Sequence, residues 1–325
     1  MSRFMVLVQT AATVLAAMLT FGCNGGPDVW ADRPGPKVVA YIPPIYSLAA
    51  TVAGDDAQVI SLLSTKGPHD YELRPSDARK LRRADLFLTI GLGLDDPIAK
   101  KLSETAGNPK LRHVAVGERL PKEMLREGTC TCGHEHKQGE AHEHDHGFDP
   151  HVWLGLPEAI AIVETIRAEL TALDPEHAEG YARRAAELTA RLQALLADGQ
   201  AKLKAKSEKA RLLTHHDSLG YFARCLGAEI VDAIELPGRD PSGKRINKLI
   251  ATCKEKNVRL IAVEPQYSTG AGAEVILREL QRQGIADPQF VVLDPLETAD
   301  AHDLTPDFYE RRMRENIEHL VRVLK

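Results

Sequence analysis

The sequence has no large excess of charge of either sign. Its 41 lysine and arginine residues are nearly balanced by 46 aspartate and glutamate residues, which gives the 325-residue chain a formal net charge of −5. The basic residues are spread along stretches with helical patterns and form no cluster. A chain of this kind lacks the electrostatic feature that attracts nucleic-acid phosphates or an anionic membrane surface. We therefore expect no nucleic-acid partner.

The H-E-x-x-H motif of many zinc hydrolases is absent from every predicted helix, and the one match, His142 to His146, lies in a histidine-rich tract without helical periodicity. A zinc hydrolase needs three protein ligands, a metal-bound water and a nearby general base. Glu264 is the only obvious base candidate, and a structural role that orients a neighbouring ligand is favoured for it. We therefore do not expect an enzyme, and a zinc-dependent hydrolase is kept as the alternative from a different functional class.

Long apolar runs are confined to the N-terminus. Residues 4–22 are apolar, follow Arg3 and end at Gly22-Cys23, which is the layout of a secretory signal peptide. A retained membrane anchor is the alternative, because the run is just long enough to span a bilayer. We predict a signal peptide at 1–22 and a Pro/Gly-rich tether at 23–36, with either a lipid on Cys23 or cleavage after Ala31. Both routes place the mature protein in the periplasm or elsewhere outside the cytoplasm.

Cysteine is scarce, with five residues in the chain. Apart from Cys23 they are Cys130, Cys132, Cys225 and Cys253. Export permits disulfides, but the sequence does not fix how these residues pair. Cys130 and Cys132 border a histidine-rich tract, so they fit a thiol pair for a metal, a disulfide or neither role.

Histidine, in contrast, is concentrated in one tract. Thirteen histidines occur in the chain, and five of them lie within a loop predicted at 130–147: His134, His136, His142, His144 and His146. Imidazole is the commonest metal ligand near neutral pH, and short histidine-rich tracts are a metal-binding composition. Because the tract has no apolar periodicity, we expect a mobile loop that provides secondary metal ligands.

Outside this tract, strand and helix patterns alternate along the chain. Eight strands are predicted at 37–42, 58–63, 86–90, 113–116, 211–215, 229–234, 259–263 and 290–293. Helical patterns separate them, including one capped by Ser76, and a run of strong helix formers covers about thirty residues from Glu176. This alternation predicts an α/β fold with mainly parallel sheets. We assign an N-terminal lobe to 37–174, a rigid connecting helix to 175–207 and a similar C-terminal lobe to 208–325.

Candidate metal ligands follow several of these strands. His69, His216 and Asp294 each come after a predicted strand, and His151 lies in an ordered-looking segment before a helix. Ligands in parallel sheets bind at the carboxyl ends of the strands. Four nitrogen and oxygen ligands in one cleft between the lobes would make a closed tetrahedral site, which suits zinc. His215 should point away if the strand continues through it.

Five motifs in a fixed order carry a resemblance to a known family. They are GPHDYELRPSD from Gly67, DPHVWL from Asp149, HDSLGYFA from His216, EPQY from Glu264 and LDPL from Leu293. Together they resemble the periplasmic zinc/manganese-binding proteins of metal ABC transporters, the cluster A-I solute-binding proteins. The resemblance covers residues 37–325. It implies two similar α/β lobes, a rigid connecting helix and one metal ion in the cleft, held by the residues that match His69, His151, His216 and Asp294.

The resemblance favours the zinc type of this family. Manganese-type members often have Glu where this chain has His216, and a third imidazole favours zinc over a harder ion. Two positions depart from the zinc-type pattern: Pro68 replaces a frequent acidic residue, and Gly155 replaces the Asp usual after Trp-Leu. The implied function is high-affinity binding of Zn²⁺ and its delivery to a membrane permease by a monomer, with a manganese- or iron-specific member as the alternative.

Overall fold

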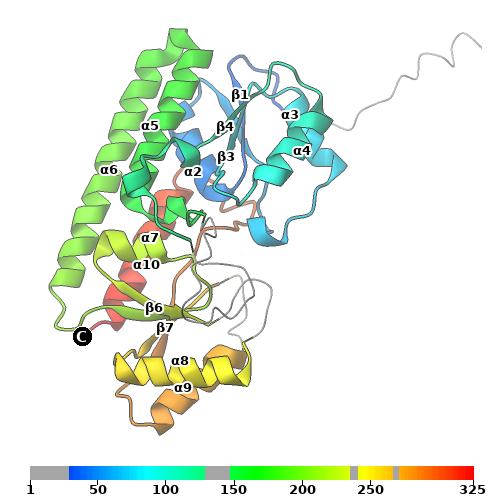
Figure 1. Ribbon diagram of the computed structural model, residues 1–325. Helices are drawn as coiled ribbons and strands as arrows, with labels where there is room; N and C mark the ends of the chain where they lie inside the picture. The colour runs from blue at the N-terminus through cyan, green and yellow to red at the C-terminus, as the bar shows by residue number, and fades with distance from the viewer. Residues whose placement is uncertain (1–28, 129–146, 235–240, 266–270) are drawn as a thin grey trace, which may run out of the picture. The chain divides into compact units, whose positions relative to one another are not determined.

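The computed structural model describes residues 29–128, 147–234, 241–265 and 271–325 (Figure 1). Pro34–Lys325 form one compact unit, and the residues up to Arg33 form a second. The predicted signal peptide and Cys23 lie outside the described residues. Within the described ranges, no helix is both long enough and apolar enough to cross a membrane.

Two four-stranded sheets contain all eight predicted strands. The first sheet consists of β1 (Lys37–Ala40), β2 (Gln58–Ser61), β3 (Leu86–Thr89) and β4 (Arg112–Ala115), in the order β2-β1-β3-β4. The second consists of β5 (Arg211–Thr214), β6 (Glu229–Ala233), β7 (Leu260–Val263) and β8 (Gln289–Val292), in the order β6-β5-β7-β8. Every pairing in both sheets is parallel. The predicted α/β fold class is therefore confirmed, and the two sheets share one strand order.

Helices connect the strands, as parallel pairing requires. They are α2 (Pro43–Ala53), α3 (Pro75–Arg82), α4 (Asp96–Ala106), α5 (Leu156–Leu173), α6 (Ala178–Lys204), α7 (Gly220–Leu226), α8 (Gly243–Glu255), α9 (Ala271–Arg282) and α10 (Phe308–Val323). Short 3₁₀ turns occur at η1 (Pro68–Asp70), η2 (Gly117–Arg119), η3 (Lys122–Met124), η4 (Val152–Leu154) and η5 (Pro175–His177). Helix α3 begins at Pro75 after Arg74, so Ser76 lies inside the helix and is not its N-cap.

Helix α6 is the longest of these elements and contacts helices from both halves of the chain. Its 27 residues pack against α5 and α2 and also against α7 and α10 (Figure 1). Gly199 makes part of this packing close, because a Cβ atom there would lie 2.9 Å from Leu226 Cδ2 and 3.1 Å from Ile317 Cδ1. The helix is shorter than the predicted range of 175–207, since η5 occupies its first turn. The lobe boundaries themselves stay a prediction.

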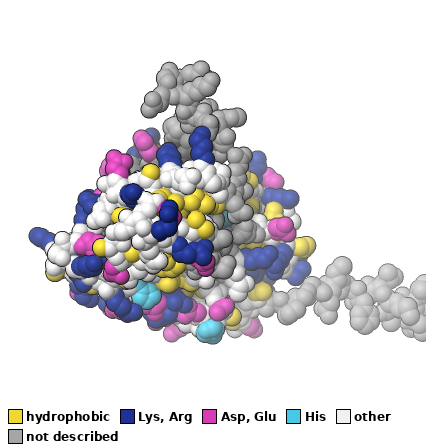
Figure 2. Space-filling view, turned by 90° about the horizontal axis from the view of Figure 1, so that it is seen from below, with side chains coloured by type: hydrophobic (Ala, Val, Ile, Leu, Met, Phe, Trp, Pro, Cys, Tyr) yellow, Lys and Arg dark blue, Asp and Glu magenta, His cyan; other side chains and the backbone are white. Residues whose placement is uncertain are grey.

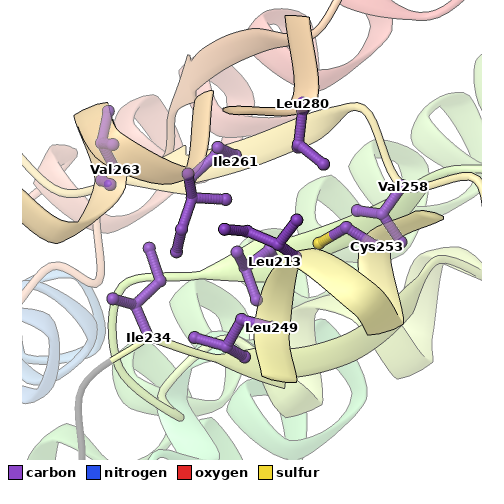
Figure 3. Close-up of a cluster of buried hydrophobic side chains, with 11 residues drawn as sticks. Leu213, Ile234, Leu249, Cys253, Val258, Ile261, Val263 and Leu280 are labelled. Atoms are coloured by element: carbon purple, nitrogen blue, oxygen red, sulfur yellow. The ribbon is translucent and has the colours of Figure 1, made fainter. Parts of the chain in front are cut away.

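The second sheet buries an apolar cluster against α8 and α9. Leu213, Ile261 and Val263 come from the strands, and Leu249 and Leu280 come from the two helices (Figure 3). Cys253, one of the two described cysteines, is buried in the same cluster, and both Cys225 and Cys253 are free thiols. Removing a buried leucine side chain from such a cluster costs about 2–5 kcal/mol. The cluster therefore fixes the sheet whose strand ends carry two of the candidate ligands.

The described surface mixes charges of both signs. Figure 2 shows Lys and Arg side chains interspersed with Asp and Glu on the face that it presents. Several ion pairs among the described residues join side chains one turn apart in the same helix, such as Arg167 with Glu164 in α5 and Lys202 with Asp198 in α6. Exposed pairs of this kind contribute roughly 0–1 kcal/mol each. These charges keep the surface solvated. The candidate functional groups are therefore sought among the buried polar side chains.

Candidate metal centre

Three of the four predicted ligands come together in the structure. His69 lies on η1 after β2, His151 precedes η4, and His216 lies two residues after the end of β5. Together with Glu297 they form a group whose potential ligand atoms all lie within 4.8 Å of one another. In the described part of the chain, this is the one group of three or more His, Cys, Asp or Glu side chains arranged in that way.

The separations in this group match a tetrahedral ion. Glu297 Oε1 lies 3.4 Å from the Nε2 atom of His69, 3.6 Å from that of His151 and 3.7 Å from that of His216. His151 Nε2 and His69 Nε2 are 3.4 Å apart. Metal–ligand bonds of about 2.0–2.1 Å in a tetrahedron place neighbouring ligands about 3.3–3.4 Å apart. The four side chains are therefore spaced to hold a small cation between them.

Two of the facing atoms are buried without a hydrogen bond. Among the described residues, His216 Nε2 and Glu297 Oε1 are solvent-inaccessible and have no hydrogen-bond partner. Buried polar atoms are almost always satisfied, and an unsatisfied one calls for an explanation such as an ion. A cation between the imidazoles and the carboxylate satisfies both atoms.

The fourth member of the group is Glu297 and not the predicted Asp294. Glu297 lies three residues further along the loop after β8, and its side chain is only 1% exposed. Asp294 Oδ1 instead accepts a hydrogen bond from Leu296 N at 2.7 Å, and its Oδ2 lies 3.9 Å from Arg312 Nε. The structure thus leaves Asp294 outside the group because its carboxylate caps the backbone of its own loop.

A carboxylate orients His151 from behind. Asp149 Oδ1 lies 2.8 Å from His151 Nδ1 and also accepts a hydrogen bond from His151 N at 2.9 Å. Arg126 forms an ion pair with the other oxygen of Asp149 at 2.5 Å. Tyr221 donates its hydroxyl to Asp149 O at 2.9 Å and accepts from Arg126 N at 3.0 Å. A proton held on Nδ1 leaves Nε2 as the free ligand atom.

His216 has an equivalent partner from another strand. Glu264 Oε1, directly after β7, lies 2.5 Å from His216 Nδ1, and the Glu264 side chain is 1% exposed. The sequence predicted that Glu264 orients a neighbouring ligand, and its contact with Nδ1 provides that geometry. The position also argues against a general base, since the carboxylate faces the back of an imidazole and not the centre of the group.

Buried charge in this group shifts the pKa values strongly. Burial raises the pKa of Glu297, but the imidazoles of His151, His216 and His69 outweigh it and hold this pKa well below 4.5. Burial lowers the pKa of His151, and Asp149 and Glu297 reverse this and raise it to about 9. Burial likewise lowers the pKa of His216, while Glu264 and Glu297 raise it to about 10. The carboxylates thus stabilise positive charge at the positions where a cation would bind.

The three histidines differ in exposure. The His69 side chain is 38% exposed, against 7% for His151 and 16% for His216. His215, the neighbour of His216, is buried and does not join the group. All three histidines of the group line a cavity of about 630 Å³, and Gly128 and Gly147 line it as well. The predicted loop histidines and the Cys130–Cys132 pair lie outside the described residues.

The two departures from the family pattern have local explanations. At Gly155, an added Cβ atom would lie 1.7 Å from Glu158 Oε2, so the Glu158 carboxylate occupies the space of a larger residue. The same carboxylate accepts from Arg224 at 2.6 Å. Beside Pro68, an added Cβ at Gly67 would lie 3.2 Å from Glu297 Oε2. The Glu297 carboxylate therefore borders the loop that carries His69.

Comparison with known proteins identifies the family. The family model of ZnuA, described as the periplasmic component A of the zinc-uptake complex, matches residues 38–323. The zinc-binding protein AdcA of Streptococcus pyogenes serotype M3 is 30% identical over 299 residues, which cover 87% of this chain and 55% of AdcA. The high-affinity zinc uptake system protein ZnuA of Bacillus subtilis is 34% identical over 276 residues, which cover 82% of this chain and 84% of that protein.

A solved structure gives the same result for the fold. The solute-binding protein FpvC from Pseudomonas aeruginosa, in complex with Mn²⁺, superposes with a TM-score of 0.74 at 27% identity, covering 89% of this chain and 98% of FpvC. The chain spans about half the length of AdcA. The match to the family model covers nearly all of the described sequence, and the chain belongs to the ZnuA family of solute-binding proteins.

Proposed function

We propose that this chain binds Zn²⁺ outside the cytoplasm and delivers it to the permease of a metal ABC transporter. The observation that carries the proposal is the group of three imidazole Nε2 atoms around Glu297 Oε1 at 3.4–3.7 Å. His69, His151, His216 and Glu297 are the proposed ligands. The names of the relatives AdcA and ZnuA, a zinc-binding and a zinc-uptake protein, support the same ion.

Zinc is favoured over manganese by the donor atoms. Three of the four are imidazole nitrogens, which suit zinc, whereas manganese prefers oxygen ligands and higher coordination numbers. The neighbour FpvC holds Mn²⁺ in its structure, so manganese is the second candidate.

The same geometry disfavours a hydrolase. A catalytic zinc site keeps one coordination position open for water, whereas Glu297 Oε1 occupies the fourth corner of this group. Glu264 contacts His216 Nδ1 and does not face the centre. A binding protein that holds and releases the ion fits this closed arrangement, so we assign no enzymatic activity.

The partner and the location follow from the proposed transport role. The relatives' names place zinc uptake with this family, and one relative, AdcA of Streptococcus pneumoniae, is named a lipoprotein. We propose a periplasmic or other extracytoplasmic monomer, tethered to the membrane if Cys23 carries a lipid. The histidines at 134–146 are proposed as weaker secondary sites that raise the local zinc concentration.

Metal analysis and competition titration test the proposal. Protein purified without added metal should contain zinc at one tight equivalent, and zinc should displace manganese from it. The matched control is Glu297→Gln, which keeps the size of the side chain and removes the charge. Tight manganese binding that zinc does not displace would overturn the zinc assignment, and hydrolysis of a model ester or peptide that depends on zinc would overturn the transport role.

A further inference from the structure

We infer that Asp294 is a positioning residue for Glu297, with its carboxylate accepting a backbone hydrogen bond instead of coordinating the ion. The inference rests on the proposed zinc-binding function. It concerns the loop from Asp294 to Glu297, which connects the end of β8 to the ligand carboxylate. Each step uses contacts of the residues in this loop and of the side chains that hold it.

The loop contains an unfavourable backbone conformation directly before the ligand. Leu296 has a φ of +62°, in the left-handed region that residues other than glycine rarely adopt. Its side chain is fully buried, so glycine cannot replace it without loss of packing. Conformations of this kind persist only where the surroundings impose them, at a cost of about 1–3 kcal/mol. The left-handed residue turns the chain, and Glu297 follows it.

Asp294 provides the contact that holds this turn. Its Oδ1 accepts from Leu296 N at 2.7 Å, which is the side-chain bond that aspartate forms with the backbone two residues further on in a turn. Pro295 between them has a fixed φ and no N–H of its own. The bond to Leu296 is therefore the interaction that ties the strained residue to the start of the loop.

Two further side chains hold the first two residues of this loop, Asp294 and Pro295, from outside. Asn316 of α10, which is 1% exposed, accepts from Asp294 N at 2.8 Å and donates to Asp294 O at 2.7 Å. Trp153 donates its indole N–H to Pro295 O at 2.8 Å, and its ring centroid lies 5.3 Å from that of His151. The backbone of the loop is thus fixed on both sides, and Trp153 links it to the loop that carries His151.

A positioning role and a ligand role predict different results for one pair of variants. Asp294→Asn keeps a side-chain oxygen that can accept from Leu296 N, while a neutral amide is a much weaker ligand than a carboxylate. Asp294→Ala removes both functions. In the positioning role, Asp294→Asn therefore stays close to the wild type. In the ligand role, the two variants lose zinc affinity alike.

The test is a zinc competition titration of the full mature chain and its variants. We expect Asp294→Ala to bind zinc about 10–100-fold more weakly, the range for residues that orient a ligand, and Asp294→Asn to remain within about threefold of the wild type because its acceptor is retained. Equal losses in both variants would overturn the positioning role. If Asp294→Ala does not fold, the zinc affinity of Asp294→Asn is compared with that of Glu297→Gln instead. An equal loss of affinity in these two variants overturns the inference.

The wild type separates this inference from the proposed function. If the wild type binds zinc tightly and Asp294→Asn and Asp294→Ala lose zinc affinity equally, only the positioning role is contradicted. A wild type that binds no zinc tightly removes the proposed function and the inference with it. The Co²⁺-loaded proteins give a second readout, because a misplaced Glu297 changes the visible absorption spectrum of the ion, whereas a purely structural defect that leaves the site intact does not.

Discussion

The His69 side and the His151–His216 side of the centre are built differently. His151 and His216 are mostly buried, and each has a buried carboxylate on Nδ1, from Asp149 and Glu264 respectively. His69 lies on a short 3₁₀ turn with its side chain 38% exposed, and within the described residues no hydrogen bond to its Nδ1 is found. Two imidazoles and Glu297 therefore form a preoriented part, and His69 completes it from the solvent side.

The largest expected effect distinguishes these two parts directly. His151→Ala and His216→Ala should each weaken zinc binding more than about 100-fold, beyond the range for outer partners, because each removes a proposed ligand that a buried carboxylate holds in position. His69→Ala should weaken binding strongly but by a smaller factor. His215→Ala is the neighbouring control and should have little effect. Competition titrations measure all four, and a loss that is greatest for His69→Ala would contradict the comparison.

The preoriented part also predicts how binding depends on pH. With pKa values raised to about 9 and about 10, His151 and His216 keep protons at neutral pH in the zinc-free protein. Zinc must displace them, so binding at pH 7.5 should release about two protons, and affinity should fall as the pH drops below about 9. This window lies above the one near pH 6 that unperturbed histidines would give. Calorimetry in buffers of different ionisation enthalpy counts the protons, and release of none at pH 7.5 would contradict the prediction.

The raised pKa values of His151 and His216 also determine in which direction the stability of the folded protein changes with pH. A histidine whose folded pKa is raised stabilises the folded state below its unfolded value near 6.5, and this contribution is lost as the pH rises through the folded pKa. The zinc-free protein should therefore lose stability progressively as the pH rises from about 6.5, the unfolded value, to about 9 for His151 and about 10 for His216. Thermal unfolding of the zinc-free chain at a series of pH values measures this loss.

The partners of the two buried imidazoles should matter less than the ligands. Asp149→Asn and Glu264→Gln keep an acceptor near Nδ1 but remove its charge, so we expect zinc affinity to fall by about 10-fold to 100-fold. Both variants should also release fewer protons on binding, since the raised histidine pKa values depend on these carboxylates. Unchanged affinity with unchanged proton release would remove the distinction between the two parts.

The smallest expected effect on the tight site comes from the histidine-rich tract. The sequence of this tract predicts a mobile loop, so each ion captured there would have to order the chain at a cost of about 1–2 kcal/mol per residue, and its sites should be weak. Deleting 133–146 should leave one tight site and remove additional weak ones. Calorimetric titration compares the zinc sites of the deletion variant with those of the full mature chain. Loss of the tight site would mean that the tract supplies primary ligands. An unchanged total stoichiometry would mean that the tract binds no zinc.

The sequence predicted most of the fold because its signals are local. Strand and helix patterns located all eight strands, since apolar runs and turn residues bound each element. Three members of the candidate centre could be predicted because His69, His151 and His216 are uncommon residue types at strand ends or in a rigid motif. Glu297 was missed because the position of a side chain in a loop depends on backbone angles that no pattern reports. The left-handed Leu296 decides which acidic residue of the loop faces the histidines, whereas Asp294 was predicted because it directly follows a predicted strand and matches the family motif. The signal that could have found Glu297 is a second acidic residue three positions after Asp294, together with the empty acidic position at Pro68.

The exposure of His69 has a consequence for the time course of release. A bound ion leaves by breaking one metal–ligand bond at a time, and the bond that water reaches most easily breaks first. His69 is the most exposed ligand, so the residence time of the ion should depend on how often η1 moves away from the other three side chains. A permease that contacts this turn can shorten the residence time without unfolding the preoriented part, and the emptied site is then ready for the next ion.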